Sequence, residues 1–129
     1  MSGGADVDFT SLTPATVAAI RGGHIVPGRY VSLVGFVERQ STTNLFEDFQ
    51  LTDGSGRLSI RHCFAASPQQ WAGGYVRVIG QVKATNVLYV WADEVQEVVS
   101  ADEISYHAIE VAVCFLRRWQ LQPSHSLSS

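Results

Sequence analysis

The sequence NLFEDFQLTDGSGRLSIRHCF, residues 44–64, contains the strongest structural signal of the chain. Its central segment Asp53–Gly56 favours a tight turn, because glycine adopts positive φ without strain and aspartate hydrogen-bonds within its own turn. The flanking residues alternate, and after the turn the two faces carry Leu58, Ile60, His62 and Phe64, and Arg57, Ser59, Arg61 and Cys63. The stretch therefore predicts a β-hairpin with one face in a core. Its other face is polar and serves either a ligand or the solvent alone.

Length and composition indicate one compact domain. The chain has 129 residues, 46% hydrophobic and 16% charged, and the charged fraction is below the roughly 25% usual for soluble domains. This low charge is compatible with apolar surface reserved for a partner, and the net charge of -3 argues against a polycation that coats nucleic acid. Residues 29–83 carry six basic and four acidic side chains, whereas residues 93–110 carry six acidic and no Lys or Arg side chains. The middle of the chain can therefore form a modest binding face.

Signals for enzymes, cofactors and membranes are missing. The sequence has no nucleotide-binding glycine loop and no serine-hydrolase, zinc-protease or paired-carboxylate motif. The four histidines are scattered singly, so we interpret each as structural or solvated. Cys63 and Cys114 lack metal-ligand spacing and favour a reduced intracellular setting. With no signal peptide and no membrane-spanning run, we expect no enzyme, no cofactor or metal, and no membrane partner.

Five strands are predicted, connected by short loops except after the third. Besides the two hairpin strands, the alternating segments are Tyr30–Gln40, Tyr75–Ala84 and Leu88–Val98. Gly35 and Gly80, each in the middle of a strand, indicate a bulge or sharp bend of the kind that small barrels need. The fold class is therefore an all-β barrel with helices, a five-stranded barrel of the oligonucleotide/oligosaccharide-binding (OB) type, whose closure removes exposed sheet edges.

Two helices flank the predicted barrel. Thr13–Pro14 is expected to begin a short helix over Ala15–Arg21, and Gly22–Gly23 to end it. Residues 100–103 form a capping box for a second helix that runs to about residue 119. The folded domain is thus expected over residues 13–119, between a flexible segment 1–12 and a disordered tail 120–129.

The second helix is apolar around nearly its whole circumference. Its two apolar seams are Ile104, Ala108, Val111 and Phe115, and then Ile109, Ala112 and Leu116. A helix that only lies on a barrel needs one apolar stripe. The second seam therefore predicts a partner interface, as in a three-helix bundle.

By the order and spacing of several segments, the chain resembles the middle subunit of replication protein A, the eukaryotic single-stranded-DNA-binding trimer. The resembling segments are Thr13–Pro14, Val31–Gly35, Ile60–Arg61, Tyr75–Gly80 and the helical series Asp102-Glu103-Ile104-x-x-His107-x-x-Glu110-Val111. The resemblance implies a nuclear OB barrel that binds single-stranded DNA in replication, repair and recombination. It also implies a C-terminal helix that joins one helix from each of the large and small subunits. The middle subunit of a telomere-capping trimer and an assembly-only scaffold stay open as alternatives.

The sequence departs from this family at the two base-stacking aromatic positions, which correspond here to Cys63 and Thr85. Tyr89 and Trp91 on the last strand are candidates to replace them, unless the terminal helix covers both. With two platforms lost, the barrel alone should bind weakly, since stacking contributes about 1–3 kcal/mol per base. The candidate DNA-contacting residues are Arg39, Thr42, Thr43, Arg57, Ser59, Arg61, Cys63, Lys83, Thr85, Asn86, Tyr89 and Trp91.

Overall fold

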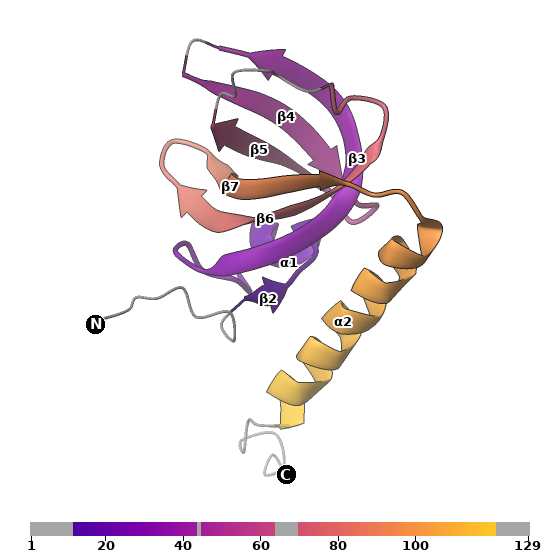
Figure 1. Cartoon of the computed structure of the whole chain (residues 1–129). Coiled ribbons are helices and arrows are strands. Elements are labelled where there is room, and N and C mark those ends of the chain that lie inside the picture. The colour runs from indigo at the N-terminus through magenta and orange to yellow at the C-terminus, as the bar shows by residue number, and fades with distance from the viewer. Residues whose placement is uncertain (1–11, 44, 64–69, 121–129) are drawn as a thin grey trace, which may run out of the picture.

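A computed structural model describes residues 12–43, 45–63 and 70–120 of the chain, apart from the side chains of the last helical residues. The elements, in chain order, are β2 (Thr13–Pro14), α1 (Val17–Arg21), β3 (Tyr30–Thr42), β4 (Phe46–Thr52), β5 (Arg57–Cys63), β6 (Tyr75–Ala84), β7 (Leu88–Glu97) and α2 (Ala101–Gln120). Strands β3 to β7 pair in the order β3-β4-β5-β7-β6, and β6 pairs back to β3. The predicted five-stranded closed barrel is thus confirmed, with α2 extending beside it (Figure 1).

Alternating side chains from the strands fill the inside of the barrel. Phe49, Leu51, Leu58 and Ile60, from the two hairpin strands, are among the most deeply buried residues. Full burial of side chains of this size contributes about 1.5–3 kcal/mol each. The helix α1 adds its buried residues Val17 and Ile20 to the same cluster, so it closes one end of the barrel (Figure 1).

The beginning of α1 differs from the sequence prediction. Thr13 and Pro14 form the short strand β2, parallel to β3, instead of the helix start. The cap is Thr16, whose side chain accepts a hydrogen bond from the Ala19 amide at 3.1 Å. The prediction was wrong here because pairing with β3, distant in sequence, extends the backbone just before the helix.

The two mid-strand glycines have different roles. Gly80 lies at a register shift between β6 and β7, as predicted. The register shift in β3 falls between Val37 and Arg39, so Gly35 is not a bulge residue. Gly35 is instead required by close packing, since a Cβ there would lie 2.7 Å from the Thr52 carbonyl oxygen.

Some predicted boundaries change at the ends of elements. β3 runs beyond residue 40 and includes Ser41 and Thr42, which were expected in a connection. The helix α2 extends through Gln120, one residue into the expected tail. The proposed flexible segment 1–12 and the disordered tail 120–129 otherwise lie outside the described residues, apart from Leu12.

The capping box of α2 forms with shifted partners. The Ser100 hydroxyl accepts from the Asp102 amide at 3.1 Å, and the Glu103 carboxylate accepts from the Val99 amide at 3.3 Å. These bonds satisfy amides at the free N-terminus of the helix. The helix therefore begins where the sequence predicted.

The helix α2 packs on the barrel through its polar stripe. Among the side chains described over residues 101–117, the buried one is His107, and the partly buried ones share one side of the helix: Glu103, Glu110, Val111 and Cys114. α2 contacts β2 and β3, where Ser32 and Val34 on the outer face of β3 are buried. The apolar seams of α2, apart from Val111, are exposed.

Candidate nucleic-acid interface

Cross-strand pairing places a mixed cationic and aromatic surface on the outside of the end of β3 and of β4, β5, β7 and β6. Residues that are direct partners across strands share a face, and two rows follow from the register. The first row is Arg39, Gln50, Ser59, Tyr89 and Lys83, and the second is Ser41, Asp48, Arg61, Trp91 and Gln81. Phe46 and Cys63 are paired where β4 begins and β5 ends. We call these two rows, with Phe46 and Cys63, the binding face.

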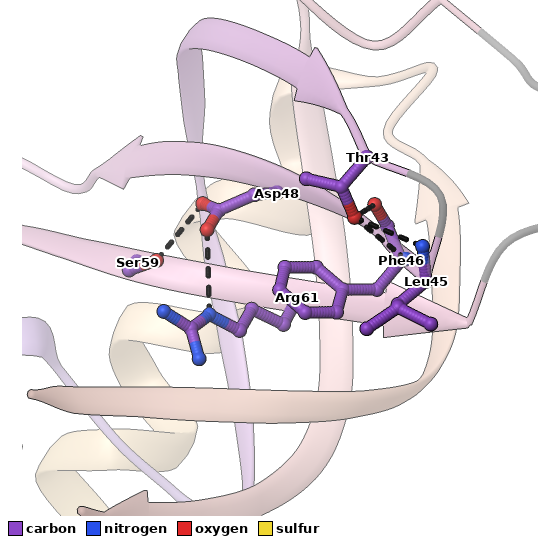
Figure 2. A network of polar contacts seen from close by, with 6 residues as sticks. All are labelled: Thr43, Leu45, Phe46, Asp48, Ser59 and Arg61. Carbon is purple, nitrogen blue, oxygen red and sulfur yellow. Dashed lines mark hydrogen bonds and ion pairs between the residues drawn. The ribbon is translucent and has the colours of Figure 1, made fainter. Parts of the chain in front are cut away.

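A polar network occupies the middle of the binding face (Figure 2). Asp48 accepts a hydrogen bond from the Ser59 hydroxyl at 2.9 Å and pairs with the Arg61 Nε at 3.3 Å. The guanidinium carbon of Arg61 lies 5.0 Å from the centre of the Phe46 ring and 4.4 Å from that of Tyr89. These distances are within the range of cation–π attraction. Arg61 is therefore fixed by one carboxylate and two rings.

The aromatic side chains form one connected cluster around Arg61. Phe46 meets Trp91 edge to face, with ring centroids 6.2 Å apart, a preferred geometry for aromatic pairs. Tyr89 and Trp91 stand two residues apart on β7 and both are half-buried. The cluster thus offers ring surface next to a guanidinium group, the combination on which unpaired bases stack.

The turn between β3 and β4 lies at one end of this cluster and is tightly bonded (Figure 2). The Thr43 hydroxyl accepts from the amides of Leu45 and Phe46 at 3.1 and 3.0 Å, and it donates to the Phe46 carbonyl at 2.9 Å. This arrangement fixes Phe46 at the start of β4 and leaves Leu45 77% exposed. The exposed Leu45 side chain therefore forms an apolar edge of the binding face.

The structure brings seven of the predicted residues together on the binding face: Arg39, Ser59, Arg61, Cys63, Lys83, Tyr89 and Trp91. The other five predicted residues lie outside the two rows. Thr42 is paired with the buried Glu47, so the two residues share the face of the sheet opposite to the binding face. The Thr43 hydroxyl forms its hydrogen bonds with the backbone of Leu45 and Phe46. Arg57, paired with Thr52, lies on the same outer side as Ser59 and Arg61 but beyond the first row, where it forms an ion pair with Glu38 at 2.8 Å.

Thr85 and Asn86 are exposed in the turn between β6 and β7, where the Thr85 amide donates to the Val87 carbonyl at 3.1 Å. This turn is adjacent to the Lys83 end of the first row. The β3–β4 turn thus lies next to Phe46 of β4, and the β6–β7 turn lies next to Lys83 of β6.

Sequence reasoning missed Phe46 and Asp48 as functional candidates. Both lie on the outer face of β4, whose inner residues include Phe49 and Leu51. The alternation of the strand carried this signal, because Phe46 is out of phase with the core residues. Only the register with β5 and β7 shows that they contact Arg61 and Trp91.

The alternative in which α2 covers Tyr89 and Trp91 is wrong. α2 packs against β2 and β3, and Figure 1 shows it beside β2 and away from β4 and β5. The partial burial of the two aromatic residues is accompanied by contacts with Phe46 and Arg61 instead.

His107 fastens α2 to the barrel. Its Nε2 lies 3.1 Å from the Ala15 carbonyl oxygen, and its Nδ1 is buried and has no hydrogen-bond partner. Burial lowers the pKa of His107 below the ordinary value of 6.5, against the opposing effect of the Ala15 bond. This histidine is structural, as the sequence indicated. Within the described ranges, no group of three or more His, Cys, Asp or Glu side chains could hold a metal ion, and no helix could cross a membrane.

Comparison with known proteins supports the fold. No family model and no curated protein matches the chain. A chain of a replication protein A heterotrimer bound to single-stranded DNA matches with a TM-score of 0.73 and 22% identity, over 82% of this chain and 96% of that one. Yeast replication protein A bound to single-stranded DNA gives 0.68 and 24%, over 86% and 94%.

A third match is the Stn1–Ten1 complex of S. pombe, with a TM-score of 0.65 and 14% identity over 74% of this chain and 77% of that one. These likenesses cover most of this chain and most of the length of the matched chains. The chain therefore has an OB fold followed by a C-terminal helix, an architecture that fits the replication protein A middle-subunit family that its sequence resembles.

Proposed function

We propose that this chain is the single-stranded-DNA-binding middle subunit of a replication protein A-like heterotrimer, acting in the nucleus in DNA replication, repair and recombination. The observation that carries the proposal is the binding face, where an aromatic cluster and cationic side chains share one side of an OB barrel. The solved structures with this fold that contain single-stranded DNA support it.

The proposed mechanism combines stacking with phosphate neutralisation. Bases stack on Phe46, Tyr89 and Trp91, each contact contributing about 1–3 kcal/mol. Arg39 and Lys83 lie at the two ends of the first row, where they can contact the phosphates on either side of the stacked bases. Because few cations take part, affinity should be modest and its salt dependence shallow.

Fluorescence anisotropy with labelled oligo-dT, measured from 20 to 200 mM salt, tests this proposal. Replacing Arg39 and Lys83 together by alanine should reduce the slope of log K against log salt by about 1.4, since each lost phosphate contact removes about 0.7. Arg117→Ala is a control that removes the same kind of charge from exposed α2 and should leave the slope unchanged. A wild-type chain that shows no salt-dependent binding, alone or with its partners, supports the assembly-only scaffold instead.

Intrinsic fluorescence provides a second readout. Trp91 packs against Phe46, so stacking of a base on this pair should quench its emission. Trp91→Ala should abolish most of the quenching by oligo-dT. Quenching of the same size in Trp91→Ala would assign the signal to Trp71 or Trp119 and remove Trp91 from the interface.

The second half of the proposal concerns α2 as the assembly element. Ile109, Phe115 and Leu116 are 58%, 64% and 55% exposed, and the smaller seam residues Ala108 and Ala112 are exposed as well. A contiguous apolar surface of this kind normally marks an interface. Packing against one helix from each of the large and small subunits would bury it from both sides.

Co-expression with candidate large and small subunits tests this assembly. Ile109→Glu with Phe115→Glu should abolish capture of both partners, while circular dichroism shows an unchanged barrel. A matched control is Tyr106→Glu, at another exposed position of α2 that lies outside the two apolar seams. Capture of both partners by the double variant would refute this role of α2.

A telomere-capping trimer is the second candidate, because the Stn1–Ten1 complex shares the fold. The same co-expression distinguishes the two: the chain should associate with the large and small subunits of a replication trimer, and not with those of a telomere-capping trimer.

A further inference from the structure

We infer that Asp48 limits the affinity of the binding face for single-stranded DNA, because it holds Arg61 as part of the stacking surface and shields its charge from phosphates. The inference rests on the proposed function and assigns a positioning residue to that site. Asp48 is an acidic side chain in the middle of a surface proposed to bind a polyanion, and this position requires an explanation.

The geometry shows that Asp48 is engaged on both oxygens. Oδ1 accepts from the Ser59 hydroxyl at 2.9 Å, and Oδ2 lies 3.3 Å from the Arg61 Nε (Figure 2). The side chains of Asp48 and Arg61 are 24% and 26% exposed, so solvent screens the pair only in part. Ser59 therefore positions the carboxylate, and the carboxylate positions the guanidinium group.

Arg61 is held where its planar group adds to the aromatic surface. Its guanidinium lies against the rings of Phe46 and Tyr89, and Phe46 in turn meets Trp91. A guanidinium plane stacks on bases much as an aromatic ring does. Arg61 in the native chain is thus a stacking element between two rings, and it replaces part of the platform lost at Cys63.

The charge of Asp48 has the opposite effect on phosphate binding. The Asp48 carboxylate lies 3.3 Å from the Arg61 Nε. A phosphate that approached the Arg61 guanidinium would therefore also approach this carboxylate. The attraction and the repulsion largely cancel, because both charges lie at nearly the same place. Arg61 should consequently contribute affinity without contributing to the salt dependence.

Asp48→Asn tests this inference because it keeps the size and polarity of the side chain but removes its charge. Arg61 then becomes available to a phosphate. The affinity for oligo-dT at 20 mM salt should rise several-fold, and the slope of log K against log salt should steepen by about 0.7, the value for one additional phosphate contact.

A double-mutant cycle makes the test specific. Arg61→Ala should weaken binding in the wild-type background with little change of slope, whereas in the Asp48→Asn background it should remove the added 0.7. Asp48→Glu restores the carboxylate and should keep the native slope. Glu94→Gln, the loss of an exposed acid outside the two rows, is the control for total charge.

The outcomes separate this inference from the proposed function. A wild-type chain without DNA binding refutes both. A wild-type chain that binds, together with an Asp48→Asn variant of equal slope or weaker affinity, refutes only the role of Asp48 as a limit on affinity. An equal steepening in Glu94→Gln also overturns the inference, because total charge would then be sufficient.

Discussion

Gly80→Ala should be among the most destabilising single substitutions in the barrel. A Cβ at this position would lie 2.2 Å from the Trp91 carbonyl oxygen and 2.7 Å from the Ala92 Cα, whereas ordinary van der Waals contact begins at 3.4 Å. The clashing atoms are backbone atoms of the paired strand β7, so no side-chain rotation relieves them. The two strands must separate exactly where the register shifts, or the bulge must re-form elsewhere.

The expected cost follows from this geometry. Overpacking a rigid site costs about 1–3 kcal/mol, occasionally more, and a clash of backbone with backbone belongs at the upper end. The loss of unfolded-state freedom in alanine offsets only about 0.4–1 kcal/mol. We therefore expect about 2–2.6 kcal/mol of net destabilisation, a large part of the 5–15 kcal/mol that stabilises a typical domain. Displacement of Trp91 should also weaken oligo-dT binding.

Gly74→Ala is the matched control. The nearest atom to its Cβ is the Trp71 carbonyl oxygen at 3.7 Å, and Gly74 is not among the glycines with positive φ. Urea unfolding of both variants, followed by circular dichroism, gives the two changes in free energy. The Gly74 variant should be neutral or slightly stabilised. Free energies of unfolding for the two variants within 0.5 kcal/mol of each other would refute the reasoning.

Three further predictions concern the ends of the barrel and α2. The lowered pKa of His107 means that the unfolded chain binds a proton more readily than the folded one, so the stability should fall as the pH drops below about 6.5. In thermal melts over pH 5–8, the melting temperature of His107→Gln should depend less on pH than that of the wild-type chain. An equal pH dependence would contradict this. Asp53→Ala removes the carboxylate that accepts a 2.9 Å hydrogen bond from the Val17 amide at the start of α1 and should cost about 1–2 kcal/mol in urea unfolding, whereas no loss of stability would contradict a capping role. Phe115→Ser with Leu116→Ser should change the stability of the isolated chain by less than about 0.5 kcal/mol but abolish any self-association in analytical ultracentrifugation, and self-association that persists would place the contact elsewhere.

Much of the fold was readable from local patterns. The alternation around the Asp53–Gly56 turn predicted the hairpin, and the predicted segment Tyr75–Ala84 coincides with β6. Such signals are local, because the period of a strand and the conformational demands of a turn depend on neighbouring residues. The apolar circumference of α2 was likewise visible in the sequence, since helical spacing alone places its residues around the axis.

The arrangement of the site was decided by contacts between residues distant in sequence. Arg61 and Trp91 were candidates from their positions in strands, but their adjacency depends on the parallel register of β5 and β7. Phe46 and Asp48 join them only through the register of β4 with β5, and a shift by one residue would turn both to the core.

The orientation of α2 also required the tertiary structure. The sequence determined that the helix has more apolar surface than one neighbour can bury, but not which side meets the barrel. The Ala15 carbonyl, 92 residues before His107 in the sequence, lies 3.1 Å from the Nε2 of the buried His107 ring. This contact turns the polar stripe toward the barrel, and the apolar seams stay outside. Local sequence thus determines the elements and their surfaces, whereas the pairing of strand edges, which depends on the whole barrel closing at once, determines which surfaces meet.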